Sequence, residues 1–268
     1  MKQFYFISGL PRSGSTLLSA ILKQNSEFYA DIASPIEALT GSSIDIITGA
    51  ESNLTVTENQ RKNLLYGIFN SYYQHIENPT IFDTSRNWTK KTNLLQALFP
   101  YTKILCPVRD VVSILNSFEV LLNKNCFYTK QINEKVFSDN IFRRTQEIFE
   151  REVVNCHTFL QEGCTLNPKM IHFIEYENLC KEPERTIKGI YDFLEKPYYS
   201  HDFEDIEYSN ENFDKSCNFK NLHTVRRKVE YKPPRCILPP KIVQKYKEMN
   251  MEFWRKNNKM NSDIIEYK

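Results

Sequence analysis

Residues 9–16, GLPRSGST, are the stretch of this sequence that decides its expected fold. They follow QFYFIS, residues 3–8, an aromatic and aliphatic run that is typical of a buried strand. From Ser15 onward, apolar residues recur at helical spacing: Leu17, Leu18, Ile21 and Leu22. A loop between a strand and the start of a helix directs backbone N–H groups and the positive end of the helix dipole at one point. We therefore expect an anion-binding turn at the end of the first strand.

The glycine spacing of this loop is that of a nucleotide P-loop, but one residue departs from the pattern. Ser15 stands where an NTP-binding loop carries its Lys, and Arg12 is the only cation in the loop. Thr16 keeps the hydroxyl that holds Mg²⁺ in such loops. The chain has only seven Gly, two of them here, so the spacing carries more weight than it would in a Gly-rich protein. The loop favours a donor that is less charged than ATP and needs no metal.

The rest of the sequence alternates strand and helix patterns. Further strands are expected at 80–83, 103–108 and 171–175, and helices at 57–75, 94–99, 110–122, 138–159, 183–194 and from about 240. Thr57 and Gln60 form a capping box at the start of the second helix. This order predicts one α/β domain over residues 1–268, with a central, mostly parallel sheet between helices. Residues 200–236 show no clear period, which predicts a long, partly ordered segment.

Composition narrows the class of protein. Hydrophobic residues make up 41% of the chain, which is enough for a core. The 35 Lys and Arg exceed the 33 Asp and Glu by only two, so we expect no nucleic-acid partner. The seven Cys include no Cys-x-x-Cys motif, which favours reduced thiols. Without a signal-peptide pattern or an apolar stretch of about 20 residues, we expect a cytoplasmic protein with no membrane partner.

Three blocks together resemble the sulfotransferase family, particularly its bacterial and tyrosylprotein-type branch. LPRSGST, residues 10–16, resembles the family's 5′-phosphosulfate loop. CPVRDVVSILNSF, residues 106–118, is similar to the 3′-phosphate motif, in which Arg109 and Ser117 lie eight residues apart. YENLCKEPERTIKGIYDFLEKP, residues 176–197, resembles a third block of the family. The blocks follow the family's order and cover much of residues 3–197.

The resemblance implies a P-loop NTPase-like three-layer fold and a donor site for 3′-phosphoadenosine 5′-phosphosulfate (PAPS), with adenosine 3′,5′-bisphosphate (PAP) as product and no metal. It assigns Arg12 to the bridging oxygen and the transferring sulfuryl group. The residues that it implies for donor binding are Pro11, Arg12, Ser13, Gly14, Ser15, Thr16, Arg109, Ser117 and Tyr176, the last beside the adenine. The position of Arg109 supports its assignment to donor binding without the resemblance, because it follows the end of an expected strand, where open α/β sheets bind ligands.

A basic stretch near the C-terminus has two readings. LHTVRRKVEYKPPR, residues 222–235, carries five Lys and Arg in fourteen positions. Such a run is often a solvated face. The resemblance implies instead that the segment folds over the nucleotide, with Arg226, Arg227 and Lys228 near the 3′-phosphate.

The general base is the least determined part of the site. Cytosolic members of the family use a His near the tip of the second strand, but FDTSRNW, residues 82–88, contains neither His nor Lys. Glu37 and Asp83 are the candidates, and Arg86 is a candidate for binding the sulfuryl group or an acidic acceptor. Ser34-Pro35-Ile36-Glu37 also reads as a capping box, which explains Glu37 without chemistry. The five His residues form no recognisable catalytic constellation in the sequence.

The sequence therefore predicts a sulfotransferase that moves a sulfuryl group to a hydroxyl or amine of an unidentified small molecule, glycan or peptide. A small-molecule kinase of P-loop type is the alternative, although the missing Lys counts against it. A catalytically degenerate nucleotide-binding protein is the other alternative, because the usual base is absent from the second strand.

Overall fold

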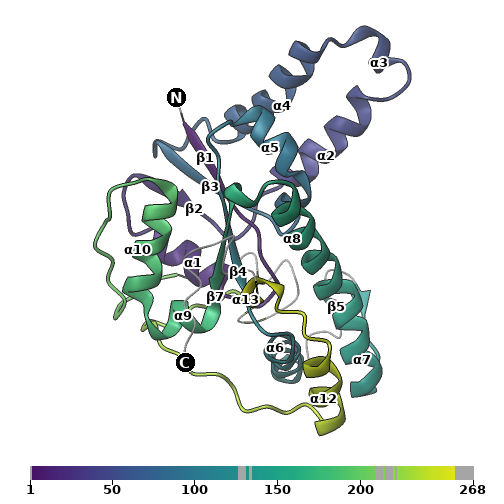
Figure 1. Cartoon of the computed structure of the whole chain (residues 1–268), viewed down its shortest axis with the longest axis vertical. Helices are drawn as coiled ribbons and strands as arrows, with labels where there is room; N and C mark the ends of the chain where they lie inside the picture. Colours follow the sequence, from purple (N-terminus) through teal and green to yellow (C-terminus); the bar gives the residue numbers. More distant parts are fainter. Residues whose placement is uncertain are drawn as a thin grey trace.

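The computed structural model describes residues 2–125, 131, 132, 135–208, 214, 220 and 222–256. Its central sheet has five strands, all parallel, in the order β2-β3-β1-β4-β7 (Figure 1). They are β1 (Gln3–Ile7), β2 (Phe28–Ala30), β3 (Thr80–Thr84), β4 (Ile104–Val108) and β7 (Ile171–Glu175). A separate antiparallel pair joins β5 (Gln131–Ile132) to β6 (Lys135–Val136). The expected α/β class with a mostly parallel sheet is confirmed.

Helices cover both faces of the sheet because each strand points alternate side chains to opposite sides. In β1, Phe4 and Phe6 enter one apolar cluster, whereas Tyr5 and Ile7 enter the other. The second cluster packs under α1 (Ser15–Leu22) and α10 (Pro183–Leu194). The first lies against α4 (Glu58–Tyr72), α5 (Thr92–Leu98), α6 (Val111–Lys124) and α8 (Asn155–Leu166). The result is a three-layer arrangement, with α1 and α10 on the side of the sheet opposite α8 (Figure 1).

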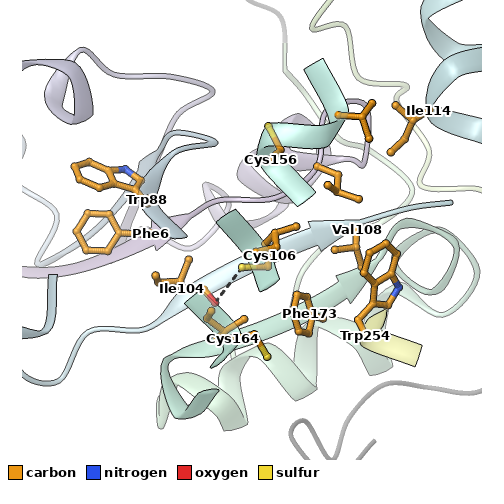
Figure 2. Packing of buried hydrophobic residues seen from close by; sticks show 14 of the residues in the cluster. Phe6, Trp88, Ile104, Cys106, Val108, Ile114, Cys156, Cys164, Phe173 and Trp254 are labelled. Atoms are coloured by element: carbon orange, nitrogen blue, oxygen red, sulfur yellow. Dashed lines mark hydrogen bonds between the residues drawn. The ribbon is translucent and has the colours of Figure 1, made fainter. Parts of the chain in front are cut away.

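Two tryptophans fill the larger of these cores. Trp88, in the 3₁₀ turn η1 (Trp88–Lys91), packs against Phe6 with ring centroids 4.8 Å apart. Trp254, in α13 (Phe253–Lys256), lies beside Phe173 of β7 (Figure 2). Both indoles are fully buried. Each Trp side chain removes a large apolar area from water, so these two contacts contribute strongly to the core.

The α2–α4 region projects from the body of the protein as a helical arm (Figure 1). It comprises α2 (Ile36–Ile47), α3 (Ser52–Thr55) and α4. The sequence did not predict strand β2, and it indicated α2 only through the capping box at 34–37. The expected capping box is present. Thr57 Oγ1 accepts a hydrogen bond from the Gln60 backbone N–H, and Gln60 Oε1 accepts one from the Thr57 backbone N–H. The apolar residues of α4 are only partly buried: Leu65 and Phe69 are buried, whereas Leu64 is 52% exposed.

The single helix expected over 138–159 is wrong in its bounds and its regularity. The chain forms α7 (Ile141–Ile148), a π-helical turn at Phe149–Val154, and then α8, which runs on to Leu166. A π turn inserts residues into the helical repeat and shifts the phase of the faces. Glu152 and Val153 of this turn are both buried.

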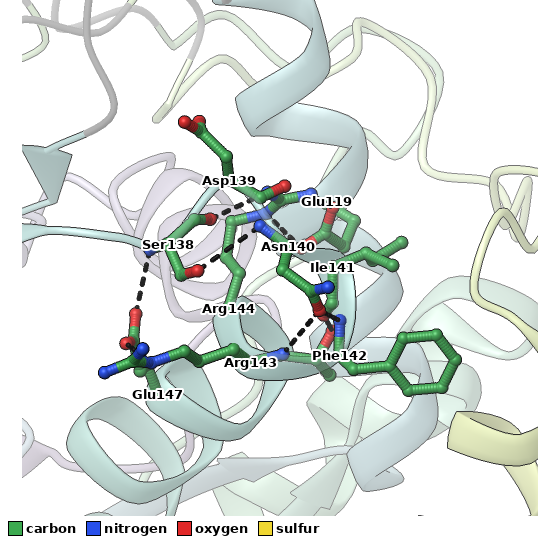
Figure 3. Close-up of polar contacts among 10 residues, drawn as sticks. Glu119, Ser138, Asp139, Asn140, Ile141, Phe142, Arg143, Arg144 and Glu147 are labelled. Atoms are coloured by element: carbon green, nitrogen blue, oxygen red, sulfur yellow. Dashed lines mark hydrogen bonds and ion pairs between the residues drawn. The ribbon is translucent and has the colours of Figure 1, made fainter.

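A buried ion pair fixes α7 against α6 (Figure 3). Arg144 donates from Nε and Nη2 to the two carboxylate oxygens of Glu119, each at 2.8 Å, and Glu119 is fully buried. Arg144 Nη1 also donates to the carbonyl oxygens of Ser138 and Asp139. Bidentate geometry and these additional bonds satisfy the buried charges, so the pair positions the start of α7. The remaining elements are η3 (Pro168–Met170), α9 (Tyr176–Lys181) and α12 (Pro240–Glu248).

Candidate active site

The glycine loop, residues 9–16, closes between β1 and α1 through two residues of left-handed backbone. Gly14, with φ of 90°, caps α1, and Arg12 has φ of 57°. A Cβ atom on Gly14 would lie 2.7 Å from Cδ2 of Tyr176, and one on Gly9 would lie 2.1 Å from the carbonyl oxygen of Pro107. Both positions therefore require Gly because neighbouring strands and helices approach the loop closely. This close packing fixes the loop at the carboxyl end of β1.

A cavity of about 810 Å³ opens above this loop, at the edge where the parallel strands end. The glycine loop, the starts of α1 and α9, and the segment 222–234 all contribute to its wall. The residues expected to bind the donor that line it are Pro11, Arg12, Gly14, Ser15, Thr16, Arg109, Ser117, Tyr176, Arg226 and Lys228. The structure thus brings together most of the residues that the three sequence blocks predict.

Arg12 joins the loop to two distant parts of the chain. Its Nε donates to Ser117 Oγ at 3.2 Å, and its Nη1 donates to the carbonyl oxygen of Leu222 at 2.7 Å. Burial, together with the positive charges of Arg86 and Arg109, lowers the Arg12 pKa to about 10. Positive charges that act on one another in this way repel, and an anion bound between them would relieve that repulsion. The cavity is therefore suited to a strongly anionic ligand.

Arg109 leaves the end of β4 and is only 5% exposed. Its guanidinium carbon lies 4.2 Å from the centre of the Tyr176 ring, and its Nη1 donates to the Arg12 carbonyl at 3.4 Å. Its Nε lies 3.4 Å from a Glu177 carboxylate oxygen but makes no hydrogen bond among the described residues. Both Glu177 carboxylate oxygens are likewise buried without a hydrogen bond among the described residues, so Arg109 and Glu177 form an ion pair without hydrogen-bond geometry.

Two of the residues predicted to bind the sulfuryl donor do not line the cavity. Ser13 is fully buried and its Oγ donates to the carbonyl oxygen of Pro11, so it holds the loop and does not line the cavity. Arg227 forms an exposed bidentate pair with Asp205 at 2.5 and 2.9 Å. Lys228 lines the cavity, but its Nζ bonds to Glu204.

The C-terminal segment itself is anchored by backbone bonds. Ile206 N donates to the Arg227 carbonyl at 2.6 Å, and Val229 N donates to the Phe203 carbonyl at 2.8 Å. This pairing holds residues 227–229 beside residues 203–206. Segment 200–236 was expected to be partly ordered and to cover the nucleotide. Its described part does reach the cavity wall.

Asp83 lies in the core and does not line the cavity. Its carboxylate accepts from Ser34 Oγ at 2.5 Å, Tyr73 Oη at 2.6 Å and Trp88 Nε1 at 2.7 Å. Burial raises the Asp83 pKa, and these three hydrogen bonds oppose that rise. The arrangement ties β3 to the starts of α2 and η1 and to the end of α4. Ser34, which does line the cavity, lies between the Asp83 carboxylate and a substrate there, and all three of these hydrogen bonds engage the carboxylate within the protein.

The capping box expected around Glu37 is wrong. Pro35 is the N-cap of α2, so the helix begins one residue later than expected, and Glu37 makes no bond back to Ser34. The Glu37 carboxylate instead lies 2.7 Å from Lys91 Nζ and accepts from Asn87 Nδ2 at 3.2 Å. Burial alone would raise the Glu37 pKa, but the bonds from Lys91 and Asn87 outweigh it and the net pKa is lowered. Glu37 does not line the cavity either.

The structure places Arg86, the candidate for binding the sulfuryl group or an acidic acceptor, in the cavity lining, and it adds residues that the sequence did not single out. Arg86 Nη1 lies 3.1 Å from Glu152 Oε2, which comes from the π turn. His223 also lines the cavity, and its Nδ1 lies 2.7 Å from Asp214 Oδ1. Other polar and aromatic residues of the cavity lining are Lys90, Arg151, Asn155 and Phe159. No local sequence signal predicts these contacts, because they join segments far apart in the chain.

Within the described part of the chain, no group of three or more His, Cys, Asp and Glu side chains is arranged to hold a metal ion. The metal-free reaction expected from the sequence stays a prediction. Of the helices that the structure describes, none has both the length and the apolar composition needed to cross a membrane.

Solved structures share this fold. The sulfotransferase domain of the Synechococcus PCC 7002 olefin synthase covers 93% of this chain and 96% of its own length, with TM-score 0.51 and 17% identity. Mouse sulfotransferase SULT7A1, solved as a complex with PAP, covers 97% of this chain and 86% of its own, with TM-score 0.52 and 15% identity. A sulfotransferase from Alicyclobacillus acidocaldarius covers 81% and 89%, with TM-score 0.51 and 13% identity. At these identities the similarity is one of fold.

Sequence comparison gives the family. No individual curated protein matches the chain. The sequence profile described as "Sulfotransferase family" matches residues 5–200, nearly three quarters of the chain, a span that includes the glycine loop, β4 with Arg109, and Tyr176. The chain therefore belongs to the sulfotransferase family.

Proposed function

We propose that this enzyme takes a sulfuryl group from PAPS and transfers it to a hydroxyl or amine of an acceptor. The observation that carries the proposal is the meeting of two cationic sites in one cavity, Arg12 in the glycine loop and Arg109 at the end of β4. A nucleotide that carries anionic groups at both its 5′ and 3′ ends matches two such sites. Mouse sulfotransferase SULT7A1, which shares the fold, was solved with PAP, and this supports the same donor here.

The residues around the cavity suggest a division of roles. The N–H groups at the start of α1 and the Arg12 guanidinium would hold the 5′ end. Arg109 and Ser117, which both line the cavity, would hold the 3′-phosphate. PAPS supplies an activated sulfuryl group when bound. Arg12 would stabilise the charge that grows on the bridging oxygen, because a buried cation acts strongly where water is excluded. Tyr176 packs under Arg109, so we expect it to orient that guanidinium as well as to border the adenine.

Ligand-induced stabilisation tests the donor. PAP without magnesium is expected to raise the melting temperature, since a ligand at 100 times its Kd stabilises the folded state by about 2.7 kcal/mol. AMP, which lacks the 3′-phosphate, is the matched control and should give a clearly smaller shift. Equal shifts for PAP and AMP would remove the role of Arg109. A larger shift with ATP and magnesium than with PAP would overturn the donor assignment and favour the kinase alternative.

A further inference from the structure

An imidazole that lines the cavity and a carboxylate lie together, and the sequence assigned a role to neither residue. His223 Nδ1 lies 2.7 Å from Asp214 Oδ1, and the backbone N–H of His223 is 3.2 Å from both oxygens of the same carboxylate. The side chains are 17% and 7% exposed, and His223 lines the cavity. The pair is therefore held by three contacts in a site that is largely shielded from water.

The pair lies beside the cation that would face the reacting group. Leu222, the residue before His223, accepts a hydrogen bond from Arg12 Nη1 at 2.7 Å. The positive charges of Arg12 and Arg86 lower the pKa of His223, and the negative charge of Asp214 raises the pKa of Arg12. His223, Arg12 and Arg86 all line the same cavity, and the bond to Leu222 holds Arg12 beside the backbone of His223.

We propose that His223 is the general base of this sulfotransferase and that Asp214 is the residue that positions it. The inference rests on the proposed function. In the transfer step the acceptor oxygen forms a bond to sulfur while the bond from sulfur to the bridging phosphate oxygen breaks. The acceptor proton moves to His223 Nε2, and the electron pair of the broken bond stays on the phosphate, beside Arg12.

The contacts of the ring support this role. A carboxylate only accepts hydrogen bonds, so its contact with Nδ1 favours the tautomer with the proton on Nδ1 and a lone pair on Nε2. Burial lowers the His223 pKa, Asp214 opposes this shift, and Arg12 and Arg86 add to it, with a net lowering. The imidazole is therefore neutral near pH 7 and able to accept a proton. Asp214 then stabilises the imidazolium that forms.

The other titratable side chains of the cavity wall are less suited to this step. Glu152 is paired with Arg86, and Glu230 with Lys232, so their charge is already engaged. Burial raises the pKa of Cys156, and it raises that of the Cys180 thiol to about 11.

Variants of the pair are tested with two phenols of different acidity as acceptor probes and PAPS as donor. His223→Gln should lower kcat by about 10²–10⁴ with phenol, the range expected for loss of a general base. The loss should be far smaller with 4-nitrophenol, because that acceptor is already partly ionised in solution. The Kd for PAP should be unchanged. His75→Gln, at an exposed site that does not line the cavity, is the matched control and should be silent.

If the wild type sulfates neither phenol, the assay uses water as the acceptor. The rate of PAPS hydrolysis by wild type and His223→Gln then replaces the phenol comparison, and the same fall is expected. Equal losses with both phenols, or wild-type hydrolysis by His223→Gln, would overturn the assignment. Failure of the wild type to bind PAP would instead overturn the proposed function, so the two failures are distinguishable.

Asp214→Asn tests the positioning role without removing the base. It should lower kcat and leave the Kd for PAP unchanged. It should also shift the His223 tautomer away from Nδ1–H, which ¹⁵N NMR of the imidazole nitrogens reports. A folded variant with wild-type kcat and an unchanged tautomer would overturn the role of Asp214. His223→Asn, which can still donate to Asp214, serves as the second variant if His223→Gln does not fold.

Discussion

Arg12 Nη1 donates a hydrogen bond to the carbonyl oxygen of Leu222 at 2.7 Å, although 210 residues separate them in the sequence. This bond, with the one from Arg12 Nε to Ser117, leaves the guanidinium little freedom to rotate. A preorganised cation stabilises developing charge without reorganising during the reaction. The geometry of the loop cation is therefore completed by a segment near the other end of the chain.

The two cationic sites are expected to differ in their kinetic effect. Arg12→Ala should chiefly lower kcat, by about 10²–10³, because its charge is used most as the bridging oxygen becomes anionic. Arg109→Ala should chiefly raise the Kd for PAP by about 10- to 100-fold, since a hydrogen bond to a charged group contributes about 1.5–3 kcal/mol. Steady-state kinetics and calorimetric titration with PAP separate the two effects.

Arg12→Lys is the matched variant for the charge. It keeps the cation, but one ammonium group cannot reproduce the planar contacts to both Ser117 and Leu222. We expect an intermediate kcat. The reverse pattern, with Arg12→Ala affecting binding and Arg109→Ala affecting turnover, would mean that the 5′ and 3′ sites are exchanged.

Gly14 is predicted to tolerate no side chain. Gly14→Ala places a Cβ 2.7 Å from Tyr176 in a backbone of positive φ, so the free energy of unfolding should fall by about 1–3 kcal/mol. Gly67→Ala is the control, because its Cβ meets nothing within 4 Å on helix α4. That change should raise stability by about 0.5–1 kcal/mol. Urea unfolding measures both, and an unchanged Gly14→Ala midpoint would contradict the packing of Tyr176 on the loop.

Glu37 is expected to act in folding and not in the chemistry. Glu37→Gln should leave kcat within about twofold of wild type. The Glu37 pKa is lowered in the folded state, so its ionised form stabilises the protein above the unfolded-state value of about 4.5. This stabilisation is lost as the pH falls through the lower folded pKa. The stability difference between wild type and Glu37→Gln should therefore shrink from about pH 6 to pH 3. A large rate defect in a stable variant would restore Glu37 as the base.

Asp83→Asn separates a core hydrogen-bond acceptor from a catalytic base. Three donors converge on this carboxylate, and an amide NH₂ group would face at least one of them. The free energy of unfolding should fall by about 1–3 kcal/mol, the penalty for unsatisfied buried donors. Turnover per folded molecule should be retained at temperatures below the transition. A stable variant with a specific loss of kcat would contradict this placement.

The sequence predicted the parts of this site that local rules determine. The glycine loop follows from a strand, two Gly and a helix start within about twenty residues, and Arg109 follows from its place at the end of a strand. Glu37 could not be placed in this way, because its partners Asn87 and Lys91 lie fifty residues or more away. The same holds for His223, whose relation to Arg12 depends on a long segment without periodicity folding back onto the loop.

The π turn shows a different limit. The helical repeat predicted a continuous helix over 138–159, and the sequence of Phe149–Val154 carries no Pro or Gly to mark the irregularity. Its effect is to add Glu152 to the buried side, where it meets Arg86. Tertiary contact, not local propensity, favours that arrangement, so a single sequence does not reveal it.

The positions of the two tryptophans, the only ones in the sequence, determine what intrinsic fluorescence can report. Trp88 and Trp254 are both fully buried in the cluster on one side of the sheet. The cluster under α1 and α10, on the other side, contains no indole. Emission therefore follows the solvent exposure of one layer, whereas far-ultraviolet circular dichroism follows both. Coincident unfolding curves by the two methods would identify a single cooperative transition, and separated curves would show that the layer carrying the start of α1 melts independently.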